Sequence, residues 1–276
     1  MRSLPKRLLA ASGALALSAV ASLVSADSEL SALAERTKPS VVLLTVEDAS
    51  GHKLGTGTGF FVSTDGRIVT NHHVIEGAAA VTATLADGSK RAVTGILADD
   101  ADKDIAILDA EGEGFPALSL GDSNAVKPGD EVVVIGSPMG LSGTLTVGIV
   151  SAIRERGIPD EVDPGAETTR SWGIQISAAL SPGSSGSPIM TRSGSVVAVA
   201  VGTLHQAQSL NFGVPIEVAK SQLEKLSPQS TANPFLTTSH NEIGKNLAIS
   251  AGVLVGLVLA YLVWGYIEAR PQKRRG

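Results

Sequence analysis

The feature that most constrains the fold is a series of short apolar runs, rich in valine and isoleucine and separated by clusters of glycine, aspartate, asparagine or serine. Many short strands at such close spacing are typical of an all-β barrel or sandwich. Only 3% of the residues are aromatic, so the core would be built from Val, Ile, Leu and Ala. Short helical patterns precede Pro39 and cover Val218 to Leu226. The apolar runs are VVLLTV, TGFFVS, RIVTN, AVTATL, DIAILDA, EVVVIG, LTVGIVSAI, WGIQIS, SPIMT, SVVAVAVG and NFGVPI.

The N-terminus has the pattern of a secretory signal peptide. A basic start is followed by an apolar segment from Leu8 to Val24 and by the small-residue motif Val24-Ser25-Ala26. The alternative is an uncleaved signal anchor, but the apolar run is short for a span and rich in Ala and Ser. We therefore expect residues 1–26 to be a cleaved signal peptide.

A second apolar segment, residues 246–267, lies near the C-terminus and carries no charge before Ile267. About 20 apolar residues span a bilayer, and a basic flank such as residues 268–276 stays on the cytoplasmic side. A buried core helix is the alternative. The pattern predicts a single transmembrane helix, joined to the body by a polar stalk over residues 228–242, with the body outside the cytoplasm.

Composition argues against several other classes of protein. The formal net charge is −5 and no basic stripe is interleaved with aromatic residues, so we expect no nucleic-acid partner. The chain has no cysteine, which excludes a thiol nucleophile and thiolate metal sites. Its five histidines show no H-E-x-x-H spacing, and no glycine-rich phosphate loop is present. We therefore predict neither a metal site nor a cofactor.

Three polar clusters beside apolar strands carry candidate chemistry: NHHV with His72 and His73, DDADKD with Asp104, and SPGSSGSP with Ser185. Each has an ordinary structural reading as a strand end or a turn. Two adjacent histidines cannot both face one site from a strand, because neighbouring side chains point to opposite faces. The order His, Asp, Ser is one of those known for a catalytic triad, in which a base activates the serine and an acid orients the base.

At these residues the sequence resembles the trypsin-like serine proteases, in particular their HtrA branch. TNHHV resembles the motif T-N-x-H-V, which implies His73 as the base. DIAIL resembles D-I-A-[LV]-[LI], which implies Asp104 as the acid rather than the three preceding aspartates. PGSSGSP resembles G-N-S-G-G, which implies Ser185 as the nucleophile. Two longer stretches, residues 120–153 and LNFGVPIEVAKSQL, also resemble the family.

The resemblance implies a chymotrypsin-like double six-stranded β-barrel over residues 28–227, flanked by short N- and C-terminal helices. The first barrel would cover about residues 38–120 and the second about 128–227. After this body the sequence continues as the predicted stalk and not as the PDZ domain that is usual in the family. The N-terminal segment before Val41 also lacks the aromatic residues through which family members form trimers, so the oligomeric state stays open.

The resemblance also implies an oxyanion hole formed by the backbone N–H groups of Gly183 and Ser185. The sequence departs from the family at two small residues of this loop, Ser184 for Asn and Ser187 for Gly. The position at the base of the substrate pocket is Ala179, followed by Leu180, which predicts cleavage after small or aliphatic residues.

Two functions remain open at this point. The first is a membrane-tethered serine endopeptidase that acts on misfolded or signalling proteins on the extracytoplasmic, periplasmic side of the membrane. The second is a catalytically silent scaffold of the same fold that binds exposed protein segments. The two differ in whether Ser185 is reactive.

Overall fold

The computed structural model describes residues 29–235, apart from 138–139, 141–142, 155–172, 204–209 and 228–229. The predicted signal peptide, membrane helix and basic tail all lie outside the described residues, as does the predicted stalk from residue 236 onward. Among the helices that the structure describes, none combines the length and the apolar character needed to cross a bilayer.

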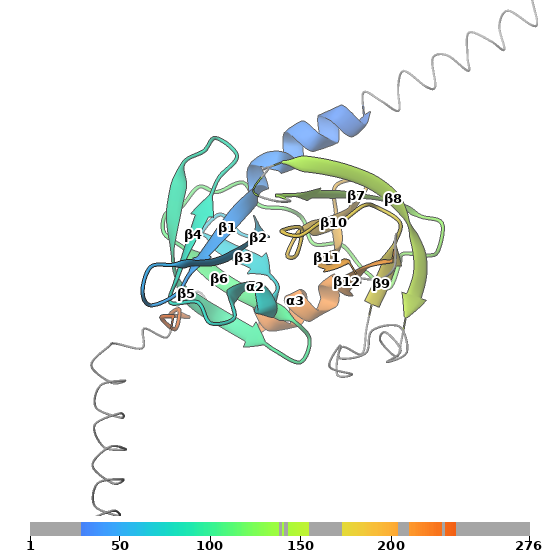
Figure 1. Cartoon of the computed structure of the whole chain (residues 1–276). Coiled ribbons are helices and arrows are strands. Elements are labelled where there is room, and N and C mark those ends of the chain that lie inside the picture. Colours follow the sequence, from blue (N-terminus) through green and yellow to red (C-terminus); the bar gives the residue numbers. More distant parts are fainter. Residues whose placement is uncertain are drawn as a thin grey trace, which may run out of the picture. The chain divides into compact units, whose positions relative to one another are not determined.

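Six antiparallel strands of the N-terminal half form the first barrel, which closes in the order β1-β2-β3-β6-β5-β4 (Figure 1). Inward-facing residues alternate along β1, where Val42, Leu44 and Val46 fill the barrel interior. A four-residue helix, α2 (His72–Ile75), leaves the barrel wall directly after β3. The strands are β1 (Val41–Glu47), β2 (Lys53–Phe61), β3 (Arg67–Thr70), β4 (Ala80–Thr84), β5 (Lys90–Asp100) and β6 (Ile105–Ala110).

The C-terminal half repeats this arrangement in a second barrel, with the order β10-β11-β12-β9-β8-β7, and ends in the helix α3 (Ile216–Glu224). The predicted all-β double six-stranded barrel is therefore confirmed. The strands are β7 (Glu131–Gly136), β8 (Thr144–Arg154), β9 (Gly173–Ile176), β10 (Pro188–Thr191), β11 (Val196–Thr203) and β12 (Asn211–Pro215).

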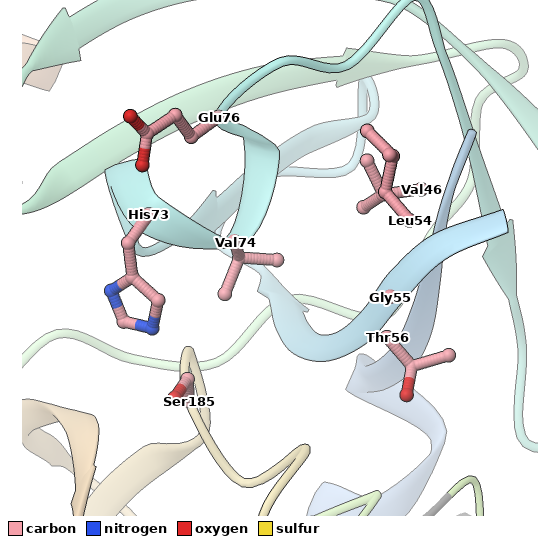
Figure 2. A pocket seen from close by; sticks show the side chains of 8 residues that line it. All are labelled: Val46, Leu54, Gly55, Thr56, His73, Val74, Glu76 and Ser185. Carbon is pink, nitrogen blue, oxygen red and sulfur yellow. The ribbon is translucent and has the colours of Figure 1, made fainter. Parts of the chain in front are cut away.

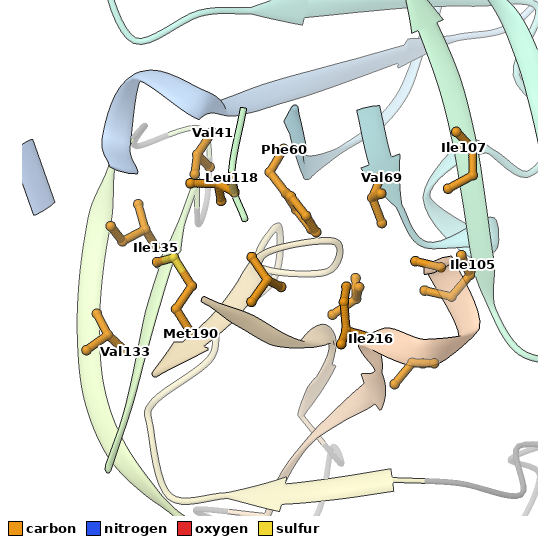
Figure 3. Packing of buried hydrophobic residues seen from close by; sticks show 14 of the residues in the cluster. Val41, Phe60, Val69, Ile105, Ile107, Leu118, Val133, Ile135, Met190 and Ile216 are labelled. Carbon is orange, nitrogen blue, oxygen red and sulfur yellow. The ribbon is translucent and has the colours of Figure 1, made fainter. Parts of the chain in front are cut away.

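A continuous hydrophobic core joins the two barrels (Figure 3). Phe60 and Val69 of the first barrel pack in the same cluster as Ile135 and Met190 of the second, and all four are fully buried. Truncating such a side chain to alanine typically costs about 2–5 kcal/mol. This shared core holds the two barrels against each other, so a site at their junction has a fixed geometry.

The two ends of the described chain also pack on the barrels. Residues 29–37 are helical, and Pro39 lies in the 3₁₀ turn η1 (Lys38–Ser40) that follows, while Leu33 reaches the core between the barrels. At the other end, residues 230–235 fall within the stretch predicted as stalk. There Asn233 exchanges two 2.8 Å backbone hydrogen bonds with Ile96 of β5, and Phe235 is buried in the first barrel.

Candidate active site

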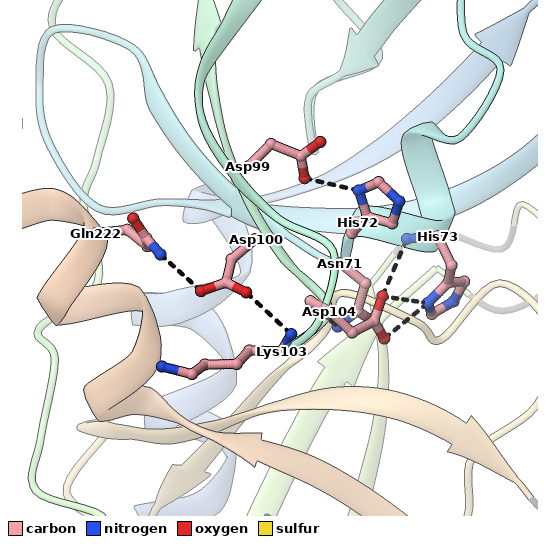
Figure 4. A network of polar contacts seen from close by, with 8 residues as sticks. All are labelled: Asn71, His72, His73, Asp99, Asp100, Lys103, Asp104 and Gln222. Atoms are coloured by element: carbon pink, nitrogen blue, oxygen red, sulfur yellow. Dashed lines mark hydrogen bonds and ion pairs between the residues drawn. The ribbon is translucent and has the colours of Figure 1, made fainter. Parts of the chain in front are cut away.

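The structure brings together two of the three predicted triad residues by direct hydrogen bonds (Figure 4). His73 lies in α2, and its Nδ1 is 2.9 Å from each carboxylate oxygen of Asp104. The backbone N–H of His73 donates to the same carboxylate at 3.0 Å. Because the carboxylate accepts from Nδ1, the proton of a neutral imidazole resides there and leaves Nε2 free to accept another.

Asp104 occupies a strained and almost fully buried position in the turn between β5 and β6. Its side chain is 1% exposed, and its φ of 55° is the one left-handed value of a non-glycine residue among the described residues. The side-chain amide of Asn71 donates to the Asp104 backbone carbonyl at 2.9 Å. Such strain persists only where the surroundings over-determine it, and here it directs the carboxylate towards His73.

Two of the other three aspartates of the DDADKD cluster have different partners. Asp99 is 2.7 Å from Nδ1 of His72, the neighbouring histidine, whose ring faces away from His73. Asp100 accepts from the side-chain amide of Gln222 in α3 and from the backbone N–H of Lys103. Both contacts are structural, since they join β5 to α2 and α3.

The loop that carries Ser185 folds tightly against the first barrel. Gly186 has a φ of 86°, and a Cβ atom on it would lie 1.9 Å from the backbone oxygen of Thr58. Only glycine fits such a close approach. The glycine after the predicted nucleophile therefore lets the loop reach across the barrel junction and present Ser185 there.

Two backbone N–H groups of this loop have no acceptor in the described part of the chain, whereas the N–H groups beside them do. Within the described residues, neither the N–H of Gly183 nor that of Ser185 donates to a protein acceptor. The intervening and following amides do donate, and their carbonyl acceptors hold the loop in shape. These bonds run from Ser184 to Ser181 at 2.8 Å, from Gly186 to Ala200 at 2.8 Å, and from Ser187 to Ser184 at 3.0 Å.

Thr58 of β2 ties the loop to the rest of the molecule. It is fully buried, its N–H donates to the carbonyl of Ser185 at 2.8 Å, and its hydroxyl donates to the carbonyl of Gly183 at 2.8 Å. The same hydroxyl accepts from the N–H of Ser137 at 3.0 Å. With both carbonyls held inward by one residue, the amides of Gly183 and Ser185 are left for another acceptor.

A cavity of about 230 Å³ lies between His73 and Ser185 (Figure 2). The hydroxyl of Ser185 donates to the carbonyl of Val201 in β11 at 2.8 Å, so it is held by the second barrel and not by the imidazole. The His73 side chain is 30% exposed. Catalytic hydrogen bonds are often long or misaligned in the absence of substrate.

The two predicted pocket residues lie in the segment after β9. Ala179 is exposed, whereas Leu180 is 9% exposed and packs within the core of the second barrel. Neither lines the cavity beside His73. The neighbouring segment 204–209 lies outside the described residues, and the role of Ala179 and Leu180 stays a prediction.

Comparison with known proteins agrees with this geometry. The model of the trypsin-like peptidase domain matches residues 57–199, just over half of the chain. The chain belongs to the trypsin-like peptidase family. The match begins in β2 and ends in β11, so it includes His73, Asp104 and Ser185.

Proteins similar to this chain are named as serine proteases, and a similar solved structure is named as an HtrA-type protease. HhoB of Synechocystis sp., named as a serine protease, is 37% identical over 74% of this chain and 49% of its own length. A DegP-like periplasmic serine endoprotease of Pseudomonas savastanoi pv. phaseolicola is 35% identical over 74% of the chain and 43% of its own length. The solved structure of the HtrA-type protease AlgW with tripeptide has a TM-score of 0.61 and 28% identity, over 70% of this chain and 62% of that one. The chain thus spans about half the length of these curated relatives, and the predicted membership of the HtrA-type serine protease family is confirmed.

Three residues of the peptidase site were missed by the sequence analysis. Asn71 stands in the TNHHV motif, so its position could have signalled a role. Thr58 stands in the glycine-rich TGTGFF run, whose pattern predicts only a strand. Val201 contributes a backbone carbonyl, for which no side-chain pattern gives a signal.

Proposed function

We propose that this protein is a serine endopeptidase in which Ser185 is the nucleophile, His73 the general base and acid, and Asp104 the orienting acid. The observation that carries the proposal is the pair of 2.9 Å contacts between His73 Nδ1 and a buried Asp104, with Ser185 facing the same cavity. A serine hydroxyl is a poor nucleophile until a base takes its proton. The arrangement supplies such a base in the required tautomer.

The proposed reaction begins when the Ser185 hydroxyl rotates from the Val201 carbonyl towards His73 Nε2. Ser185 Oγ attacks the scissile carbonyl carbon while Nε2 takes the proton, and Asp104 stabilises the imidazolium that forms. Breaking the C–N bond releases the new amine, to which His73 gives the proton. Water then attacks the acyl ester by the same route, and Ser185 regains its proton.

The developing negative charge on the scissile oxygen would be stabilised by the N–H groups of Gly183 and Ser185. Both are unpaired within the described residues, and donors aimed at the oxyanion are usually the largest single contribution to such catalysis. Thr58 holds the carbonyls of Gly183 and Ser185 by hydrogen bonds. The hole would then need no reorganisation when the charge forms.

Protein segments are the proposed substrates, cut after small or aliphatic residues through a pocket based on Ala179 and Leu180. AlgW is a protease solved with a tripeptide, and the DegP-like relatives are named as periplasmic endoproteases, which supports peptide substrates outside the cytoplasm. Tethering of the protease body to the membrane by residues 246–267 is proposed from the sequence, as is removal of residues 1–26.

Casein degradation by the full chain tests this function, with Ser185→Ala as the inactive variant. Ser181→Ala is the matched control, since it removes an exposed serine hydroxyl from the same loop. We expect the wild type and Ser181→Ala to degrade casein, and removing the triad serine to lower turnover by about 10⁶. Degradation that survives in Ser185→Ala would refute the assignment.

One observation favours a second function, a silent scaffold that binds protein segments. The Ser185 hydroxyl is held by Val201 and not by His73. If this arrangement persists with substrate bound, casein would bind without being cut, and wild type and Ser185→Ala would behave alike.

A further inference from the structure

The cavity between His73 and Ser185 has a composition that the proposed reaction does not account for. All its walls except Ser185 come from β1, β2, α2 and the residue that follows α2, all in the first half of the chain (Figure 2). Val46, Leu54 and Val74 form apolar walls, and Glu76, which follows α2 and carries its carboxylate on the His73 side of that helix, also lines the cavity (Figure 2). Leu54 is 52% exposed, the highest value among the exposed large hydrophobic residues of the described chain.

We propose that this cavity receives the side chain of the residue that follows the scissile bond, and that Glu76 gives it a preference for lysine or arginine. The inference rests on the proposed endopeptidase function. It adds to that function a class of substrate, which is defined by the residue on the leaving-group side of the scissile bond.

The direction of the substrate follows from the roles of the two residues that border the cavity. The acyl half stays bonded to Ser185, with its oxygen at the amides of Gly183 and Ser185 in the second barrel. The released amine takes its proton from His73, so its nitrogen must lie within hydrogen-bond reach of the imidazole. This nitrogen belongs to the residue that follows the scissile bond. The side chain of that residue therefore enters the space that His73, Leu54 and Val74 enclose.

The walls match a side chain with an apolar stem and a positive tip. Lysine and arginine bury their methylene groups along apolar surface while their charged ends stay near water. Leu54 and Val74 provide such a surface, and the exposed Glu76 carboxylate provides the opposite charge. No ion pair occupies Glu76 among the described residues, so its carboxylate is available to a substrate.

Two acidic residues follow the cavity-lining Val46 in the chain, although neither lines the cavity itself. Glu47 ends β1 and Asp48 follows it, and both are only partly exposed. The neighbouring cation is Lys53, which is exposed at the start of β2 and is the strand partner of Glu47. A negative side chain on the substrate would meet Glu76 in the cavity, and would be disfavoured by like-charge repulsion.

A four-peptide series tests the inference with the full-length protein. Mass spectrometry of a casein digest first identifies one cleaved bond. Quenched fluorescent peptides then carry that bond with Arg, Lys, Met or Glu immediately after it, and kcat/KM is measured for each. Wild type is compared with Glu76→Gln and Glu76→Lys, and with Glu113→Gln, which neutralises an exposed acid of the first barrel that does not line the cavity.

We expect wild type and Glu113→Gln to cleave the Arg and Lys peptides about three to five times faster than the Met peptide, which is the upper range for an exposed charge pair. Glu76→Gln should bring the three within about twofold, and Glu76→Lys should favour the Glu peptide. Equal rates in wild type, or an Arg preference that survives in both Glu76 variants, would overturn the inference. If wild type cuts no casein and no peptide, the proposed function itself fails, and the inference with it.

Discussion

Replacing Thr58 by valine removes one hydroxyl from the centre of the barrel junction. Valine keeps the shape of the side chain but leaves the carbonyl of Gly183 and the N–H of Ser137 without their partner. An unsatisfied buried polar group costs about 1–3 kcal/mol. Ser137 is 1% exposed, whereas Gly183 is partly exposed and can take water instead, so we expect a loss of about 2–3 kcal/mol.

This loss should lower the melting temperature by about 4–12 °C, since 1 kcal/mol corresponds to about 2–4 °C in a domain of this size. The folded protein remains the dominant species at 25 °C, where activity is measured. Removal of an oxyanion donor typically lowers kcat by about 10²–10³. Thr58 positions the donors without being one, so we expect kcat to fall about 10- to 100-fold and KM to stay within about twofold.

The control for this prediction is Thr58→Ser, which keeps the hydroxyl and loses only the methyl group. Circular dichroism melting gives the stability, and steady-state cleavage of one quenched peptide gives kcat and KM separately. Serine should restore kcat to within a few-fold of wild type. A valine variant with unchanged kcat, or a serine variant as slow as valine, would refute the argument that the hydroxyl positions the loop.

Three further changes have outcomes set by the structure. Ser187→Ala should raise the unfolding free energy by about 1 kcal/mol, measured by urea denaturation, because this hydroxyl is buried with no partner among the described residues. Gly95→Val should release residues 230–235, since a Cβ at Gly95 would lie 2.2 Å from the backbone oxygen of Asn233; limited proteolysis should then cut this segment. The hydrogen bond from Arg192 lowers the pKa of Glu131 below its ordinary 4.5, so this pair stabilises the fold above that pH and less as pH falls. Melting curves of Arg192→Gln should therefore differ from wild type at pH 7 and converge with it at pH 2.

Strand content followed from the sequence because the physical signal is local. Val42, Leu44 and Val46 alternate with less buried neighbours along β1, as a strand with one face in a core requires. The pairing order of the twelve strands is set by contacts between distant residues, and only the family resemblance indicated it. Phe235 shows the same limit, because a lone aromatic residue in a polar stretch does not indicate that it packs in the core of the first barrel.

The candidate site also could be predicted only in part from the sequence. The residue types and motifs singled out His73 and Asp104, and the structure joins them directly. The choice between Asp99 and Asp104 depends on which way each residue faces at the end of β5 and in the turn after it, which no spacing rule supplies. Thr58 lies more than a hundred residues from the loop it holds, so its role appears only once the two barrels are packed together.

Labelling by a fluorophosphonate probe tests the central claim, that Ser185 is an activated nucleophile, most directly. The full-length protein is treated with the probe beside Ser185→Ala and Ser181→Ala, and the modified peptide is identified by mass spectrometry. We predict a single adduct on Ser185 in wild type and Ser181→Ala, and none in Ser185→Ala. An unlabelled wild type, or an adduct that persists in Ser185→Ala, would contradict the account.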